Sequence, residues 1–351
     1  MAITKKIKIY CEEAYVETIW CKELLGGLMK ELKKRRLAFE ESNDIEMVSE
    51  DTWAFVLGMN RKWIQTGIES CNEKGVVPIV LSNQVLDHLK GQYHLVCPNV
   101  HKMAKDLKEA LSLAGRKNLA LYGSNQKNDL DKNRTEIFAE LISKVEDIYP
   151  NNGSLEKCFR NFLPKAAVYD GVICINGYGA LSLVKKLEKE NPQLLERLVI
   201  LTFEEVLKHS KYNQWISYME MNLENYGTTA LQLLDMISQK EDISSMTVMM
   251  KCKLCDILPK QEMSEMMDGA ESETEDPEIL QMAKVEQLLR DADDMDHHII
   301  AMLLDHATYT EIADSCYMTE GNVKYRVKKY LSVSGCNTKK ELIELLKEYL
   351  Q

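Results

Sequence analysis

Apolar and polar positions divide the chain into two parts with different periodicity. Up to about residue 250, short apolar runs typical of strands alternate with stretches in which apolar residues recur every three or four positions. The strand-like runs lie at 6–10, 53–58, 76–81, 93–96, 117–123, 167–175, 197–203 and near 246–252. The helix-like stretches lie at 16–36, 61–74, 101–114, 132–146, 178–190 and 223–239. This alternation predicts doubly wound α/β layers, and the nearly continuous apolar run at 167–175 indicates a parallel sheet buried on both faces.

Beyond this part the composition changes. Residues 262–278 contain eight acidic residues and no basic one, so we predict a solvated linker in which like charges repel. Pro277 suits the first turn of a following helix at 278–290, which has apolar residues at helical spacing. We therefore predict a sensing domain at 1–256, an acidic linker at 257–277 and a helical domain at 278–351.

The helical domain has the pattern of a helix-turn-helix. Helical periodicity covers 296–305, 309–315, 319–331 and 338–350. Thr308 or Thr310, Thr319 and Thr338 stand where N-caps are expected. The segment between the second and third of these helices is short. Such a turn is typical of units that place the following helix in the major groove of DNA.

Charge is unevenly distributed over the chain. The net charge of −11 argues against a generally basic nucleic-acid binder, but groove binding depends on where the basic residues lie. On an ideal helix over 319–331, Val323, Val327 and Tyr330 share an apolar side. The other side and its borders carry Gly321, Asn322, Lys324, Tyr325, Arg326, Lys328 and Lys329. We therefore predict that a basic face of this helix points outward.

These residues resemble the LuxR-type (GerE-type) helix-turn-helix of bacterial transcription factors. The resemblance rests on Glu311-Ile312-Ala313, on 318–324, and on Gly335 with a downstream basic residue before Glu341-Leu342-Ile343. Asn322 replaces the usual Thr, and Val333-Ser334 replaces Lys-Leu. The resemblance implies that 319–331 is the recognition helix, with lysines on phosphates and Asn322, Tyr325 or Arg326 near base edges. The implied DNA-binding residues are Thr319, Asn322, Lys324, Tyr325, Arg326, Lys328, Lys329 and Lys339.

Residues 5–255 resemble the effector domain of the Lac/galactose repressor family, which has a two-lobed periplasmic-binding-protein-like fold. The segment 96–99 matches a crossing between lobes, 170–176 matches the family strand that ends in Asn-Asp, and 201–205 and 222–230 match later signatures. The resemblance implies a ligand between the lobes, at the carboxyl ends of the strands. The candidate ligand residues are Tyr15, Arg134, Asn176, Glu204 and Trp215. Gly177 replaces the family's Asp, so an acid that binds sugars in that family is missing here and a sugar is not assumed. The expected effector is a sugar or another polar metabolite.

Other chemistries find little support in the sequence. There is no GxGxxG after a strand, no P-loop and no HExxH motif, so we expect neither an enzyme nor a cofactor. The ten cysteines are irregularly spaced, and the CxxC at Cys252 and Cys255 has no second pair to complete a four-ligand zinc site. We therefore expect no metal.

Location and assembly can also be predicted. No long apolar run predicts a membrane span, and the alternating Lys and Ile of 5–9 are not a secretion signal, so a cytoplasmic protein is expected. We predict a homodimeric one-component transcriptional regulator that binds double-stranded DNA under control of a small effector. A solute-binding protein, an enzyme using the cleft and a protein-interaction scaffold remain the alternatives.

Overall fold

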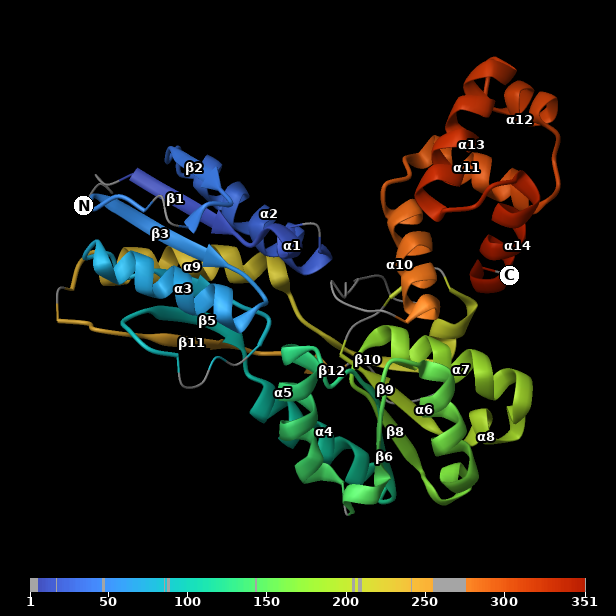
Figure 1. Cartoon of the computed structure of the whole chain (residues 1–351), viewed down its shortest axis with the longest axis horizontal. Coiled ribbons are helices and arrows are strands. Elements are labelled where there is room, and N and C mark those ends of the chain that lie inside the picture. The colour runs from blue at the N-terminus through green and yellow to red at the C-terminus, as the bar shows by residue number, and fades with distance from the viewer. Residues whose placement is uncertain are drawn as a thin grey trace.

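Two α/β lobes carry a group of helices at the C-terminal end of the chain (Figure 1). The computed structural model describes residues 6–16, 18–45, 48–84, 86, 89–142, 144–203, 206–207, 210–240, 242–254 and 276–350. The predicted fold class is confirmed, with two doubly wound sheets and a small all-helical part. The predicted acidic linker falls almost entirely on 255–275, outside the described residues.

Lobe 1 is built on a parallel sheet with the strand order β11-β5-β4-β3-β1-β2. Its strands are β1 (Lys6–Cys11), β2 (Phe39–Ser42), β3 (Thr52–Leu57), β4 (Ile79–Leu81), β5 (His94–Pro98) and β11 (Thr247–Met250). Its helices are α1 (Glu13–Val16), α2 (Ile19–Lys34), α3 (Arg61–Glu73) and α9 (Leu223–Ile237). Side chains of β1 face two hydrophobic clusters, one on each side of the sheet. Ile7 and Ile9 pack with α2 and α9, whereas Tyr10 packs with α3.

Lobe 2 repeats this plan, with the strand order β12-β10-β9-β8-β6-β7. Its strands are β6 (Leu119–Ser124), β7 (Ile148–Pro150), β8 (Gly171–Cys174), β9 (Val199–Thr202), β10 (Ile216–Glu220) and β12 (Lys253–Leu254), of which β12 runs antiparallel to β10. Its helices are α4 (Val100–Leu113), α5 (Asp129–Phe138), α6 (Leu155–Phe162), α7 (Gly177–Glu190) and α8 (Pro192–Arg197). The chain passes between the lobes after β5, after β10 and after β11.

Asparagines begin five of the helices that follow strands. Each accepts a hydrogen bond through its side-chain oxygen from the backbone N–H three residues later, at 2.8–3.2 Å. These N-caps satisfy donors that the first helical turn leaves without an intrahelical partner. The capping residues are Asn60 in α3, Asn99 in α4, Asn128 in α5, Asn176 in α7 and Asn222 in α9.

Two glycines let α2 and α9 cross closely on lobe 1. A methyl group at Gly27 would overlap the backbone carbonyl of Glu224, and one at Gly227 would overlap the backbone nitrogen of Leu28. The two helices therefore touch through their backbones, and only glycine fits at these positions. The neighbouring Gly26 has open space around its Cα.

The C-terminal helices are α10 (Pro277–Arg290), α11 (Asp294–Leu304), α12 (Tyr309–Ser315), α13 (Glu320–Ser334) and α14 (Lys339–Leu350). We call α10–α14 the helical unit. Helix α10 lies between lobe 2 and the other helices (Figure 1) and packs against α13. The predicted caps Thr308 and Thr319 are present, and Thr338 accepts a hydrogen bond from the N–H of Glu341.

Several short elements escaped the sequence prediction. These are β2, β7, β10, β12, α6 and α8. Strand β2 lies at a sheet edge and reads Phe-Glu-Glu-Ser, so it lacks the apolar run of a central strand. In the described part of the chain, no helix is long and apolar enough to cross a membrane.

Candidate functional sites: a cleft and a helix-turn-helix

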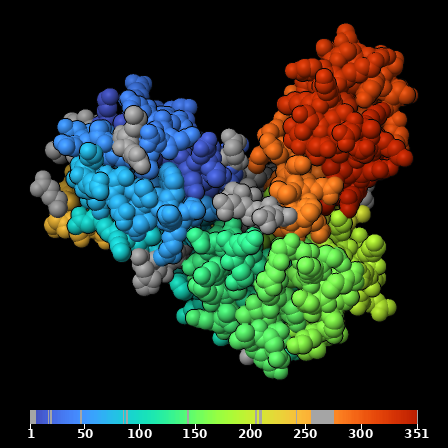
Figure 2. All heavy atoms as spheres, in the orientation of Figure 1, coloured from blue at the N-terminus to red at the C-terminus, as the bar shows by residue number. Residues whose placement is uncertain are grey.

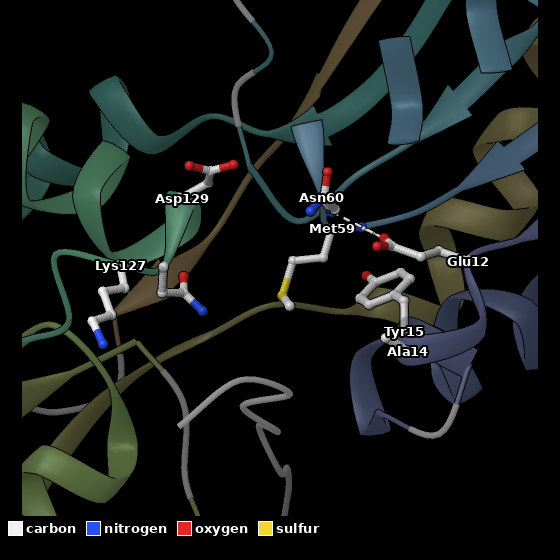
Figure 3. A pocket seen from close by; sticks show the side chains of 8 residues that line it. Glu12, Ala14, Tyr15, Met59, Asn60, Lys127 and Asp129 are labelled. Carbon is white, nitrogen blue, oxygen red and sulfur yellow. Dashed lines mark hydrogen bonds between the residues drawn. The ribbon is translucent and has the colours of Figure 1, made fainter. Parts of the chain in front are cut away.

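A small cavity lies between the lobes at the carboxyl ends of β1, β3 and β6 (Figure 3). Its volume is about 60 Å³. Lobe 1 contributes Glu12, Ala14, Tyr15, Met59 and Asn60, and lobe 2 contributes Lys127, Asn128 and Asp129. Open α/β sheets bind ligands at this end of their strands, so the cavity is the candidate ligand site.

Tyr15 is the one predicted ligand residue among those that line this cavity. Its side chain is 1% exposed, and its hydroxyl has no hydrogen-bond partner among the described residues. In Figure 3 the hydroxyl lies on the cavity side of the ring, towards Met59. Burial raises the pKa of Tyr15 well above its ordinary value, so the hydroxyl is neutral and able to donate.

Glu12 has a fixed orientation in the wall of the cavity. One carboxylate oxygen accepts hydrogen bonds from the backbone N–H of Met59 at 2.8 Å and of Asn60 at 2.9 Å. On the opposite lobe, the side-chain oxygen of Asn128 accepts from the N–H of Asp131. Backbone donors around the cavity are thus already paired with protein acceptors.

Arg134 is not one of the residues that line the cavity. It is 2% exposed and donates to the carbonyl oxygen of Ile175 at 3.2 Å. Its guanidinium lies 4.7 Å from the ring centroid of Phe203 and 5.9 Å from that of Trp20, at the start of α2. The side chain therefore joins the two lobes.

Asn176 uses its side chain inside lobe 2. Its oxygen accepts from the N–H of Gly179 at 2.8 Å, and its nitrogen donates to Asp131 at 2.9 Å. Asp131 also accepts from the backbone N–H of Asn125 at 2.8 Å. This buried network fixes the start of α7 to the loop and helix that follow β6.

Of the other two predicted ligand residues, Trp215 does not line the cavity. Trp215 ends a 3₁₀ turn (η5, Lys211–Trp215) just before β10, so it lies at the amino end of the sheet. Its indole packs on the outer-face cluster of lobe 2. Glu204 lies outside the described residues.

Helices α12 and α13 form the predicted pair of helices joined by a tight turn. Val323, Val327 and Tyr330 are buried, as the sequence pattern predicts. Of the eight residues that the resemblance places at DNA, six are exposed in this structure. These are Thr319, Asn322, Lys324, Tyr325, Lys328 and Lys329. The unit stands out from the lobes in Figure 2.

Three of the predicted DNA-binding residues already have partners within the unit. Arg326 donates to Asp293 at 3.0 Å and to Asp296 at 2.5 Å, and these carboxylates raise its pKa. Lys339 donates to the carbonyl oxygen of Ala307 at 2.8 Å and lies over the ring of Tyr309. Lys324 pairs with Glu320 at 3.0 Å. Lys328 and Lys329 have no ion pair within the described part of the chain, so they are the basic groups most available to a phosphate.

The helical unit is docked on lobe 2 by buried polar contacts. The hydroxyl of Tyr178 in α7 donates to Glu286 in α10 at 2.5 Å, and both side chains are buried. Lys186 in α7 pairs with Glu278 at 2.6 Å. Asp276, the N-cap of α10, accepts from the N–H of Leu155 at 2.7 Å.

A second set of contacts joins α14 to lobe 2. Lys185 pairs with Glu348 and lies over the ring of Tyr349, and the Tyr212 hydroxyl donates to the carbonyl oxygen of Glu348 at 3.2 Å. The sequence pattern did not predict these contacts, because they join segments more than a hundred residues apart.

The cysteines do not form a metal site in the described part of the chain. No group of three or more His, Cys, Asp or Glu residues there is arranged to hold a metal ion. Cys252 is buried, and burial raises its pKa to about 11, which keeps it a thiol. Cys255 lies outside the described residues.

Neither a protein-family model nor a curated protein sequence matches the chain. Solved structures do match it. The cellobiose complex of the transcriptional regulator CelR has a TM-score of 0.55 at 12% identity, over 72% of this chain and 83% of that one. A LacI family transcriptional regulator from Enterococcus faecium with bound ribose has a TM-score of 0.54 at 15% identity, over 74% and 100%.

A third match is the Lac repressor dimer bound to operator and the anti-inducer ONPF. It has a TM-score of 0.56 at 11% identity, over 72% of this chain and 80% of that one. The matched proteins are transcriptional regulators with a two-lobed sensor. At these identities the similarity shows the fold that the chain shares with them.

Proposed function

We propose that the protein is a homodimeric, effector-responsive transcriptional regulator that binds double-stranded DNA through α13. The observation that carries the proposal is the exposed face of α13, the second helix of a helix-turn-helix. Lys328 and Lys329 lie there beside Asn322 and Tyr325, whose side chain is 74% exposed. Lysines supply phosphate contacts, and polar or aromatic side chains between them reach base edges.

The charge of the helical unit makes this face the expected point of contact. Residues 277–350 contain nine basic and thirteen acidic residues. A DNA duplex is therefore not attracted to the unit as a whole, and it has to meet the helix on which the lysines gather. We expect binding to be selective and salt-sensitive.

A continuous route of contacts supports control by an effector. Asn128 lines the cavity and caps α5, where Asp131 binds the Asn176 cap of α7. Two residues further along α7, Tyr178 binds Glu286 on α10, which packs on α13. A ligand that changes the position of lobe 2 would therefore carry the helical unit with it. The shift it causes is limited by its difference in affinity for the two arrangements.

The first experiment measures DNA binding at several salt concentrations. The full chain is titrated onto DNA fragments from around its own promoter, beside a Lys328→Ala/Lys329→Ala variant. We expect fragment-selective binding that falls with salt. The slope of log affinity against log salt should be about 2 units shallower in the variant, since two phosphate contacts are lost.

A matched control removes two lysines elsewhere. Lys105 and Lys108 are exposed on α4 of lobe 2, so Lys105→Ala/Lys108→Ala changes the net charge equally. This control should keep the original slope. Equal behaviour of the two variants, or binding without preference for any fragment, would reject α13 as the recognition helix and favour a protein-interaction scaffold.

A further inference from the structure

The charged groups of the cleft limit the kind of ligand that fits. Glu12 and Asp129 bring a carboxylate from each lobe to the same cavity. In Figure 3 the ammonium group of Lys127 points away from Tyr15 and Met59. Among the described residues that line the cavity, the charged side chains are thus two carboxylates and one ammonium, and negatively charged acceptors favour a cationic donor.

The guanidinium of Arg134 and the backbone donors around the cavity are already engaged. The guanidinium of Arg134 stacks on Phe203 and donates to Ile175. The backbone N–H groups of Met59 and Asn60 donate to Glu12. A carboxylate or phosphate ligand would approach two carboxylates, with Lys127 as the one cationic side chain among the described lining residues, so it is disfavoured.

The phenol of Tyr15 offers a hydrogen-bonding partner for a hydroxyl group of the ligand. Its buried phenol has no hydrogen-bond partner among the described residues, and a buried polar group of this kind is costly unless it is paired. A ligand hydroxyl would supply the missing hydrogen-bond partner of this phenol. The ring of the same residue and the thioether of Met59 offer a polarisable surface to an ammonium group.

The size of the cavity limits the ligand further. A volume of about 60 Å³ holds a few water molecules, since a single water needs at least about 10–15 Å³. A ligand of a few non-hydrogen atoms therefore fits this arrangement. A disaccharide, such as the cellobiose in the CelR complex, would need a much wider cleft.

We propose that the effector is a small amine with a hydroxyl group, bound as its ammonium ion between Glu12 of lobe 1 and Asp129 of lobe 2. Its hydroxyl pairs with Tyr15. The ammonium group would draw the two lobes together, because its two acceptors lie on different lobes. This inference rests on the proposed function only in taking the cavity as the effector site.

Three probes of nearly equal size test the charge preference. Ethanolamine, ethylene glycol and glycolate are titrated into the full chain, and binding is followed by calorimetry and by the shift in thermal midpoint. We expect ethanolamine to bind about tenfold more tightly than ethylene glycol, as a charge-assisted hydrogen bond allows, and glycolate to bind most weakly. Asp129→Asn should remove most of the preference for ethanolamine over ethylene glycol. Tyr15→Phe should weaken the binding of both.

The control variant is Asp314→Asn, an exposed carboxylate on α12, which should leave all three affinities unchanged. Tightest binding of glycolate, equal binding of ethanolamine and ethylene glycol, or no binding of any probe would overturn the inference. None of these measurements requires DNA. Ethanolamine binding by a protein that fails the promoter assay would leave the ligand inference standing and reject the regulator. Promoter binding without probe binding would leave the regulator standing and reject the ligand inference.

Discussion

The outer faces of the two lobes differ, although both are covered by helices. On lobe 1 the outer-face cluster, which includes Tyr10, Val56 and Ile68, contains only residues of that lobe. On lobe 2 the corresponding cluster runs from Val172 and Leu183 without interruption into Ile279, Val323 and the rest of the helical unit. The helical unit is therefore an extension of lobe 2.

This difference shows where a signal would have to travel. In the described structure, the outer-face cluster of lobe 1 includes no residue of the helical unit. Lobe 2 carries the candidate DNA-binding surface and also supplies Lys127, Asn128 and Asp129 to the cavity. A ligand that changes the angle between the lobes would move the helical unit relative to lobe 1 without any change inside the unit.

The largest expected effect comes from a substitution where α2 and α9 cross on lobe 1. A Gly27→Ala substitution puts a methyl group into the backbone of α9, so the two helices of lobe 1 must separate. We expect a loss of about 3 kcal/mol in the free energy of unfolding, at the upper end of overpacking costs. Urea denaturation of the full chain measures it.

Gly26→Ala is the matched control for this prediction. Gly26 precedes Gly27 in α2 and has open space around it. Alanine there should stabilise the protein by about 0.5–1 kcal/mol, because glycine is unfavourable within a helix. A similar effect of both substitutions would mean that α2 and α9 do not cross as closely as described.

An intermediate effect is expected where lobe 2 meets the helical unit. Tyr178→Phe removes the donor to the buried carboxylate of Glu286, and a hydrogen bond to a charged group contributes about 1.5–3 kcal/mol. We expect this loss in urea denaturation. We also expect the substitution to speed amide hydrogen exchange, relative to the wild type, more in α10 than in α2, since the docking contact lies on α10.

Tyr212→Phe tests the same interface with a neutral acceptor. Its hydroxyl donates to the carbonyl oxygen of Glu348, so the expected loss is about 1 kcal/mol or less. If Tyr178→Phe cost no more than Tyr212→Phe, the α7–α10 contact would not hold the unit on lobe 2, and the contrast between the lobes would weaken.

The two candidate sites also differ in how far the sequence predicts them. Seven of the eight DNA-binding predictions lie on α13 or at its N-cap, and one helical period determines which of these side chains face outward; the eighth, Lys339, begins α14. Even there, the pairing of Arg326 with Asp293 was missed, because the partner lies on another helix. The cavity is assembled from loops after β1, β3 and β6, and no periodicity relates them. The sequence contains one indication of Asn60 and Asn128, because asparagine is a preferred N-cap and each stands just before a helix.

A small effect is predicted within the helical unit, at the contact between α11 and α13. Burial alone would raise the pKa of Asp296, but hydrogen bonds from Tyr330 and Arg326 outweigh it and hold the pKa below its usual value. The stability that this carboxylate contributes is therefore present above its unfolded pKa and is lost as the pH falls through the lower, folded pKa. Arg326→Gln removes one stabilising partner and should cost about 1 kcal/mol near neutral pH, since the arginine is partly exposed and screened. Urea midpoints measured from about pH 7 down to about pH 2 should show the variant losing stability at a higher pH than the wild type. If the two pH profiles were parallel, Arg326 would not set the ionisation of Asp296. It would then be available to DNA, as the sequence resemblance implied.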